Sequence, residues 1–160
     1  MTPPPDSFRP AQKWLHWLTA SCIILQYAMF DGIGRLFGQG VESGAMPYTF
    51  VTIGHIVLGT TVLVFALLRL TLRWRHGVPP HPAAEPAIAT LAAKVAHCGL
   101  YVLIIGLPVL GLLAWFLPSE RLAELHATGT TLLIWLVIAH VAAVVVHQVW
   151  WRTDILRRMT

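Results

Sequence analysis

The sequence predicts an all-α integral membrane protein, with four transmembrane helices in a single domain over residues 1–160. Two observations carry this fold class. Hydrophobic residues make up 56% of the chain and charged residues only 11%, whereas a soluble domain carries about a quarter charged residues. Four segments are each apolar over about the 20 residues that a helix needs to cross a bilayer. A chain with so few charges could not cover its own surface in water.

The four predicted spans cover residues 14–37, 50–72, 94–117 and 122–151, and Pro108 interrupts the third. The first helix can start earlier than its hydropathy suggests, because Ser7 can cap it and Pro10 can occupy its first turn. A cleaved signal peptide is the weaker interpretation of this segment. Its apolar run is longer than the usual stretch of about 7–15 residues, and it contains a histidine.

Residues 73–93 form the predicted cytoplasmic connection between the second and third spans. Four prolines lie between Arg73 and Ala87, which is too many for a helix. His76 and His81 are expected to be solvated in this loop.

Lysine and arginine are distributed unequally over the two sides of the membrane. One side has a net charge of +6 and carries nine of these residues: Arg9, Lys13, Arg69, Arg73, Arg75, Lys94, Arg152, Arg157 and Arg158. The other side has a net charge of −2 and carries only Arg35 and Arg121. Because these residues are enriched in cytoplasmic loops, both termini are predicted to be cytoplasmic. The positive balance is a topology signal, and nucleic acid is not a predicted partner.

Six histidines fall within or at the ends of the predicted spans: His16, His55, His97, His126, His140 and His147. Ionisable side chains are costly in a membrane and usually face the helix bundle with a function. Almost no Asp, Glu or Lys accompanies them, which disfavours a histidine-lined proton or metal transporter. Neutral imidazoles suit the binding of a metal-containing cofactor. The alternative is that they are packing histidines, hydrogen-bonded between helices.

The spacing of two of these histidines indicates two cofactor levels. His126 and His140 are fourteen residues apart, so they share a helix face and lie about 21 Å apart along the axis. That distance is too long for one metal ion and suits two stacked haems. His55 matches His126 in depth, so these two form a candidate pair. Gly59 and Gly129 follow them by about one turn, and small residues there permit close approach of a porphyrin or of another helix.

The partner of His16 remains open at this point. By depth alone His147 matches His16 better than His140 does. However, His126 and His147 would lie about 31 Å apart, nearly the full hydrocarbon thickness, which is far for electron transfer between two haems.

Four segments together give a family resemblance. They are "HW" at His16, "GHIVLGTTVLVFALLRL" from residue 54, "AHCGLYVLIIGLPVLG" from residue 96 and "LHATGTTLLIWLVIAH" from residue 125. In this order and at these distances, the chain resembles the bacterial cytochrome b561 family. These are four-helix membrane cytochromes with two haems, related to the cytochrome b subunits of nickel hydrogenases.

The resemblance implies a four-helix bundle with cofactor ligands facing inward. It implies two non-covalent b haems, with His16 and His140 binding one iron and His55 and His126 the other. The resemblance, and not the depth argument, selects His140. It also implies electron transfer in the inner membrane of a bacterium, commonly to or from quinone.

Further roles follow from position. Arg69 lies fourteen residues after His55, where it could pair with a haem propionate or extend to the membrane surface as a cytoplasmic anchor. Lys94, His97 and His147 cluster near the cytoplasmic end with Trp150, as candidate quinone and proton contacts. Interfacial anchoring is the alternative for Lys94 and Trp150.

The predicted function is therefore that of an electron-transfer protein or quinone-linked oxidoreductase, embedded in lipid and reduced by a protein or small-molecule donor. Some family relatives oxidise superoxide, an anion that a positive outer surface would attract. The net charge of −2 on the outer side does not favour that substrate, but a local positive funnel with Arg35 and Arg121 could still form. Superoxide:quinone oxidoreductase activity therefore stays among the predicted functions, beside electron transfer from a cationic or protein donor. The alternative function is a haem-bearing membrane anchor of a larger dehydrogenase or hydrogenase.

Overall fold

A computed structural model describes residues 7–30, 32–80, 86–153 and 155–160. The described residues contain five α-helices, one short 3-10 helix and no strand. The elements are α1 (Pro10–Met29), α2 (Ile33–Ser43), α3 (Phe50–His76), α4 (Ala87–Phe116), α5 (Glu120–Val149) and η1 (Ile155–Arg158). His81, predicted to be a loop histidine, lies outside the described residues.

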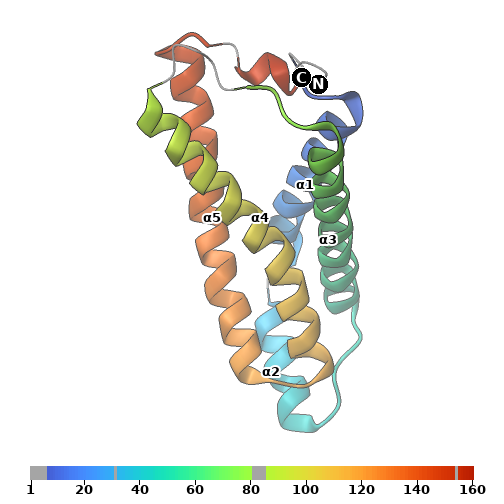
Figure 1. The fold of residues 1–160 in the computed structure, drawn as a ribbon. Helices are drawn as coiled ribbons and strands as arrows, with labels where there is room; N and C mark the ends of the chain where they lie inside the picture. The colour runs from blue at the N-terminus through green and yellow to red at the C-terminus, as the bar shows by residue number, and fades with distance from the viewer. Residues whose placement is uncertain (1–6, 31, 81–85, 154) are drawn as a thin grey trace.

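The long helices α1, α3, α4 and α5 run along the long axis of the molecule (Figure 1). Helix α2 lies at one end, called here the α2 end, and η1 lies at the other, the η1 end. Helix α1 packs on α3, α3 on α4, and α4 on α5. At the η1 end, Lys13 Nζ donates to the Thr160 carbonyl at 2.6 Å and Trp17 Nε1 to that of Met159 at 2.8 Å. These bonds hold the start of α1 against the segment after α5.

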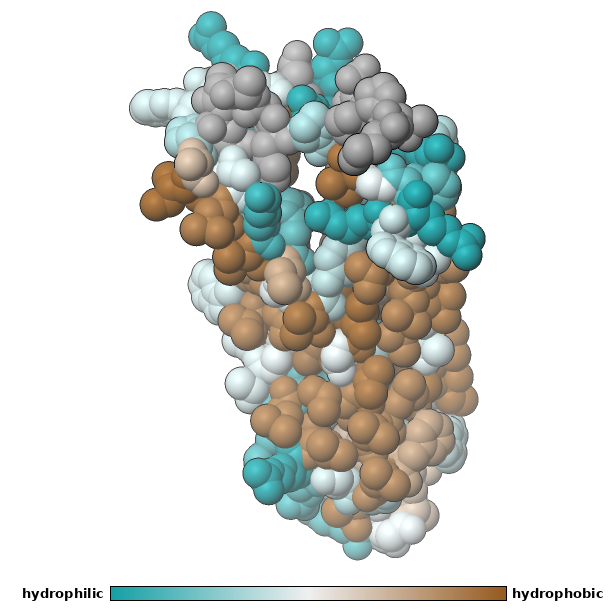
Figure 2. All heavy atoms as spheres, viewed as in Figure 1, coloured by the Kyte–Doolittle hydropathy of each residue, from teal (hydrophilic) through white to brown (hydrophobic). Residues whose placement is uncertain are grey.

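The outer surface of the molecule is apolar over most of its length. Helices α3, α4 and α5 are long and apolar enough to cross a membrane. Large side chains such as Val102 and Trp135, each 65% exposed, face outward. Figure 2 shows hydrophobic residues along the middle of the molecule and hydrophilic ones gathered toward its ends. Water-soluble proteins rarely expose so large an apolar area, so this is a membrane protein. A fourth span on α1 stays a prediction.

The boundaries of the first span were partly wrong. Helix α1 begins at Pro10, earlier than hydropathy suggests, but its N-cap is Arg9 instead of Ser7. The Gln12 side chain accepts a hydrogen bond from the Arg9 backbone at 3.0 Å. The helix ends at Met29 and does not continue to residue 37, because Gly32 adopts a left-handed φ of 87° and α2 starts after it.

The predicted loop over residues 73–93 was too long. Helix α3 continues to His76, which lies half-buried in its last turn, and stops at Gly77 with a φ of 70°. Helix α4 begins at Ala87, directly after Pro86. Proline restricts the residues just before it and not those that follow, so the four prolines exclude helix only between these points. Helix α4 is continuous through Pro108, as membrane helices tolerate proline when neighbouring groups compensate.

The interior is packed most closely midway along the molecule. A cluster of buried residues from α3, α4 and α5 fills this region: Val62, Ala66, Ile104, Leu107 and Leu133. Helices α4 and α5 approach so closely that a Cβ atom on Gly129 would lie 2.4 Å from Leu107 Cδ2. Small residues commonly permit such contacts between membrane helices.

We therefore expect Gly129→Ala to destabilise the protein by about 1–3 kcal/mol, because Leu107 must move within a packed interior. Gly106→Ala is the matched control, since a Cβ atom there meets nothing within 4 Å. Thermal unfolding in detergent measures both variants. Equal melting temperatures for the two would contradict the close packing of α4 on α5.

Candidate cofactor-binding site

Four histidines face one another in two pairs across the interior. The rings of His16 on α1 and His140 on α5 have centroids 6.4 Å apart and planes inclined by 66°. The rings of His55 on α3 and His126 on α5 have centroids 6.0 Å apart and planes inclined by 71°. Helix α5 thus supplies one ring to each pair, at the fourteen-residue spacing seen in the sequence.

These separations fit a metal ion between each pair of rings. An imidazole nitrogen binds a metal at about 2.0–2.1 Å, so two rings on opposite sides of one ion have centroids about 6.3 Å apart. Nδ1 of His16 and Nδ1 of His55 are buried and have no hydrogen-bond partner. Purely structural histidines in a protein interior would normally have their polar atoms paired. The geometry therefore favours ligand binding over packing.

A cavity of about 600 Å³ surrounds the pair nearer the α2 end, His55 and His126. We call it the α2-end cavity. Its size falls within the range of about 300–1,000 Å³ typical of ligand and cofactor pockets, and its walls are mainly apolar. Gly59 and Gly111 line it. A Cβ atom on Gly111 would lie 3.0 Å from His126 Cε1, so glycine at this position leaves the imidazole in place.

The orientation of the His126 ring is fixed from α4. Its Nδ1 lies 2.8 Å from the Leu107 carbonyl oxygen. The carbonyl can only accept, so Nδ1 carries the proton and donates it. Nε2 is then the nitrogen with a free lone pair. Metal-binding histidines are commonly held in this way by a carbonyl on the other ring nitrogen.

A second cavity, of about 550 Å³, contains His16 and His140 and is called the η1-end cavity. Three arginines line it together with these rings: Arg69, Arg73 and Arg158. The Arg69 guanidinium carbon lies 5.7 Å from the centroid of the Tyr101 ring. Arg158 Nη1 donates to the Pro80 carbonyl at 2.7 Å. This arrangement suits a cofactor that carries carboxylates, which guanidinium groups bind strongly.

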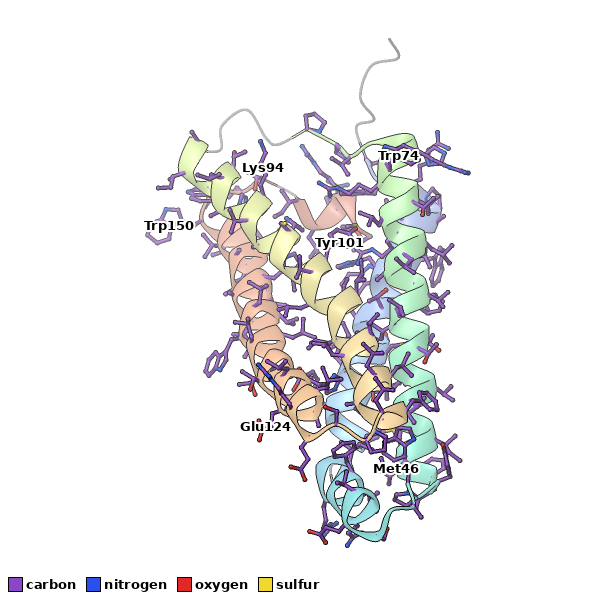
Figure 3. All side chains as sticks on the ribbon, turned by 60° about the horizontal axis from the view of Figure 1, so that its bottom comes forward. Met46, Trp74, Lys94, Tyr101, Glu124 and Trp150 are labelled. Carbon is purple, nitrogen blue, oxygen red and sulfur yellow. The ribbon has the colours of Figure 1, made fainter. Side chains whose placement is uncertain are left out.

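The predicted quinone contacts are only partly brought together. His97 and His147 line the η1-end cavity, whereas Lys94 is exposed and is not among its lining residues. Figure 3 shows Lys94 and Trp150 toward the same end of the molecule, and Trp150 is 81% exposed. Their position favours the anchoring interpretation for both.

His140, and not His147, is the ring found beside His16. His147 is buried and its ring lies 4.5 Å from that of Trp151. Its Nδ1 lies 3.0 Å from Thr153 Oγ1. The His97 ring lies 5.3 Å from that of His140, so the η1-end cavity holds a third imidazole next to the facing pair.

Two polar groups in the α2-end cavity were not predicted. Gln26 Nε2 donates to the His55 carbonyl at 2.9 Å, while its Oε1 is buried without a partner. Trp115 is 5% exposed and its Nε1 has no partner. Gln26 is a lone amide in the apolar run "CIILQYAMF" and could have been noticed. Nothing in the sequence distinguishes Trp115 from the other six tryptophans.

Comparison with known proteins identifies the family. The sequence profile described as prokaryotic cytochrome b561 matches residues 7–160. This chain belongs to the prokaryotic cytochrome b561 family. Membership makes it a membrane cytochrome of the b type, with haem b as its cofactor and electron transport as its general role. The prediction of the family from four short segments is confirmed.

Individual relatives within the cytochrome b561 family are distant. Cytochrome b562 of Cereibacter sphaeroides is 28% identical over 151 residues, covering 92% of this chain and 91% of the relative. Cytochrome b561 homolog 1 of Escherichia coli K12 is 26% identical over 175 aligned positions, covering 96% and 97%. A Yersinia pestis protein named "Probable superoxide oxidase CybB" is 29% identical over 102 residues, covering 63% and 53%.

The cavities fit the cofactor of the cytochrome b561 family. Each has facing imidazoles at a separation that would accommodate one iron between them, and each has mainly apolar walls. The arginines of the η1-end cavity match the carboxylates of a haem. His16, His55, His126 and His140 are the residues whose geometry fits the role of iron ligands.

We expect Gly111→Val to lower the haem content of the purified protein, because its side chain would displace the His126 ring. Gly106→Val on the same helix is the control, since the space at Gly106 is open. Haem per chain is measured by pyridine haemochrome absorbance. Unchanged haem in the Gly111 variant would show that the position of the His126 ring does not matter for binding.

Proposed function

We propose that this protein is a di-haem cytochrome b that transfers electrons through the membrane and exchanges them with quinone. One observation carries the proposal: two pairs of facing histidines, each in its own cavity, at the ring separations that one iron between two imidazoles requires. His16 and His140 would hold the haem of the η1-end cavity. His55 and His126 would hold that of the α2-end cavity.

The protein supplies ligands, dielectric environment and access, while a bound haem supplies a reversible one-electron carrier. If two imidazoles held one iron, they would favour electron transfer over the binding of a substrate at the metal. The apolar walls exclude water, and this limits reorganisation when an electron arrives. The His126 bond to the Leu107 carbonyl makes that imidazole a stronger donor to the metal.

The wall between the two cavities supports transfer from one to the other. Ile23 and Ile104 line both cavities. Ile104 belongs to the buried cluster midway along the molecule, and Ile23 packs against that cluster. Two haems bound there would be separated by a layer of side chains without any extended polar region. This arrangement suits rapid electron exchange along the molecule.

The η1-end cavity is the proposed place of exchange with quinone. Reduction of a quinone takes two electrons and two protons, and oxidation of a quinol releases them. His97 and His147 line this cavity, and imidazole is the side chain that most often donates and accepts protons in catalysis. Lys94 is assigned an anchoring role at the membrane surface, because it is exposed and does not line the cavity.

We place the protein in the inner membrane of a bacterium as a four-helix bundle, with both termini cytoplasmic. Helix α1, at 20 residues, is long enough to serve as the fourth span. The arginines that line the η1-end cavity belong to the nine basic residues of the predicted cytoplasmic side. The positive-inside rule then directs the η1 end to the cytoplasm.

Superoxide is not favoured as the electron donor. The Yersinia pestis relative carries that activity in its name, but this chain spans about half of its length. Among the described residues, no Lys or Arg lines the α2-end cavity, whereas Glu124 does. A negative wall repels an anion. A neutral or cationic reductant, or a partner protein, suits this end better.

Purified protein should show the difference spectrum of haem b with two haems per chain. His55→Ala and His126→Ala should each remove one haem and leave the other, because each deletes one ligand of the same cavity. His76→Ala is the control, since His76 lies in the last turn of α3 outside both cavities. One haem per wild-type chain, or loss of both haems in each ligand variant, would refute the assignment.

A short-chain quinol should reduce the isolated protein without any partner, as followed by haem absorbance in stopped flow. His97→Gln and His147→Gln should each slow this reaction by about 100-fold or more, in line with the loss of acid–base assistance. Lys94→Gln should leave the rate within about twofold of wild type. Absence of reduction by quinol, with both haems present, would favour the alternative of a membrane-anchor subunit.

A further inference from the structure

The two cavities differ sharply in the charge of the residues around them. Three guanidinium groups line the η1-end cavity, from Arg69, Arg73 and Arg158. No Lys or Arg of the described residues lines the α2-end cavity, and its wall includes the carboxylate of Glu124. All 11 Lys and Arg residues of the sequence fall within the described ranges. The comparison of basic residues is therefore complete, whereas the acidic residues Asp6, Asp31, Glu85 and Asp154 lie outside the described ranges and are not part of it.

The positions of these charges are set by packing. Arg69 is half-buried and lies over the Tyr101 ring, whose place on α4 is labelled in Figure 3. Arg158 is half-buried and held by the Pro80 carbonyl. Glu124 is exposed near the start of α5 (Figure 3), so solvent screens its charge more than those of Arg69 and Arg158.

Fixed positive charge stabilises the addition of an electron to a nearby site, and a negative charge opposes it. The effect is strong where water is excluded, because the effective dielectric constant is low. Local net charge is one of the recognised determinants of the potential of a protein-bound metal centre. The haem carboxylates offset part of the positive charge, but a haem would bring the same pair to each cavity.

We infer that the two haem sites have unequal potentials, the η1-end site being the higher, and that Arg69 is a principal residue setting the difference. This inference rests on the proposed binding of one haem in each cavity. The step concerned moves one electron from a ferrous iron at the α2 end, which becomes ferric, to a ferric iron at the η1 end, which becomes ferrous. No proton or further reactant is needed, and the charges favour transfer toward the quinone end.

The test is a potentiometric titration of the purified holoprotein, followed by haem absorbance. His126→Ala should leave only the η1-end haem, and His16→Ala only the α2-end haem. The midpoint potential of the first variant should be the higher. In the two-haem protein, Arg69→Gln should shift electron distribution between the haems about tenfold toward the α2 end, equivalent to about 59 mV for one electron.

Matched variants separate the effect of charge in the cavity from that of overall charge. Arg75→Gln makes the same change six residues further along α3, where the side chain is exposed and does not line the cavity. It should leave both midpoints in place. Glu124→Gln should raise the midpoint potential of the α2-end haem, by less than Arg69→Gln changes that of the η1-end haem. Glu120 does not line the cavity, so Glu120→Gln should leave the midpoint potential of the α2-end haem unchanged. If the Arg69→Gln variant loses the η1-end haem, the Arg158→Gln variant is titrated in its place.

A higher midpoint at the α2 end, or equal shifts from the Arg69 and Arg75 variants, would overturn the inference. Both results require two bound haems and would leave the proposed function standing. Wild-type protein with fewer than two haems would instead overturn the proposed function itself. The haem count, taken before the titration, distinguishes the two failures.

Discussion

An imidazole in the interior of a membrane protein must be given a partner, and the arrangement of the helices follows from that constraint. Water is excluded, and few other polar side chains lie between the spans. The rings lie opposite one another, with centroids 6.4 Å apart in one pair and 6.0 Å in the other, so a metal ion bound between each pair would serve as the partner. Helix α5 provides one ring of each pair, while α1 and α3 provide the others. Helices α1, α3 and α5 thus come together at the two facing pairs of rings.

The rest of the sequence combines the two facing histidine pairs with close packing of the helices. Midway along the molecule the helices touch through small and aliphatic residues, with Ala66 fully buried and Gly129 against Leu107. On either side of this layer the helices leave two cavities of similar volume, about 600 and 550 Å³. The cavities share their architecture but not their charge. Similar ligand sets in different electrostatic surroundings are a simple way to make two chemically identical cofactors behave differently.

The sequence predicted the helical class from its long apolar runs and the family from four short segments, which are local signals. Depth within the spans predicted that His55 and His126 lie at the same level, and the structure places their rings 6.0 Å apart. It could not pair His16 by depth, since hydropathy alone started the first span at residue 14 and not at Pro10. The break at Gly32 was missed because apolar residues continue beyond it. Only the packing of the helices shows that Gln26 of α1 and Trp115 of α4 line the same cavity. Such contacts join residues far apart in the chain, which periodicity cannot reveal.

The closure of the η1-end cavity has a consequence for biosynthesis. Ile155, Leu156 and Met159 line this cavity, and the Met159 carbonyl is bonded to Trp17. These residues follow α5 in the chain, so they leave the ribosome after all four long helices. Among the described residues, none after Leu133 lines the α2-end cavity. The α2-end cavity could thus form before the segment after α5 has packed, whereas the η1-end cavity needs that segment for its closure.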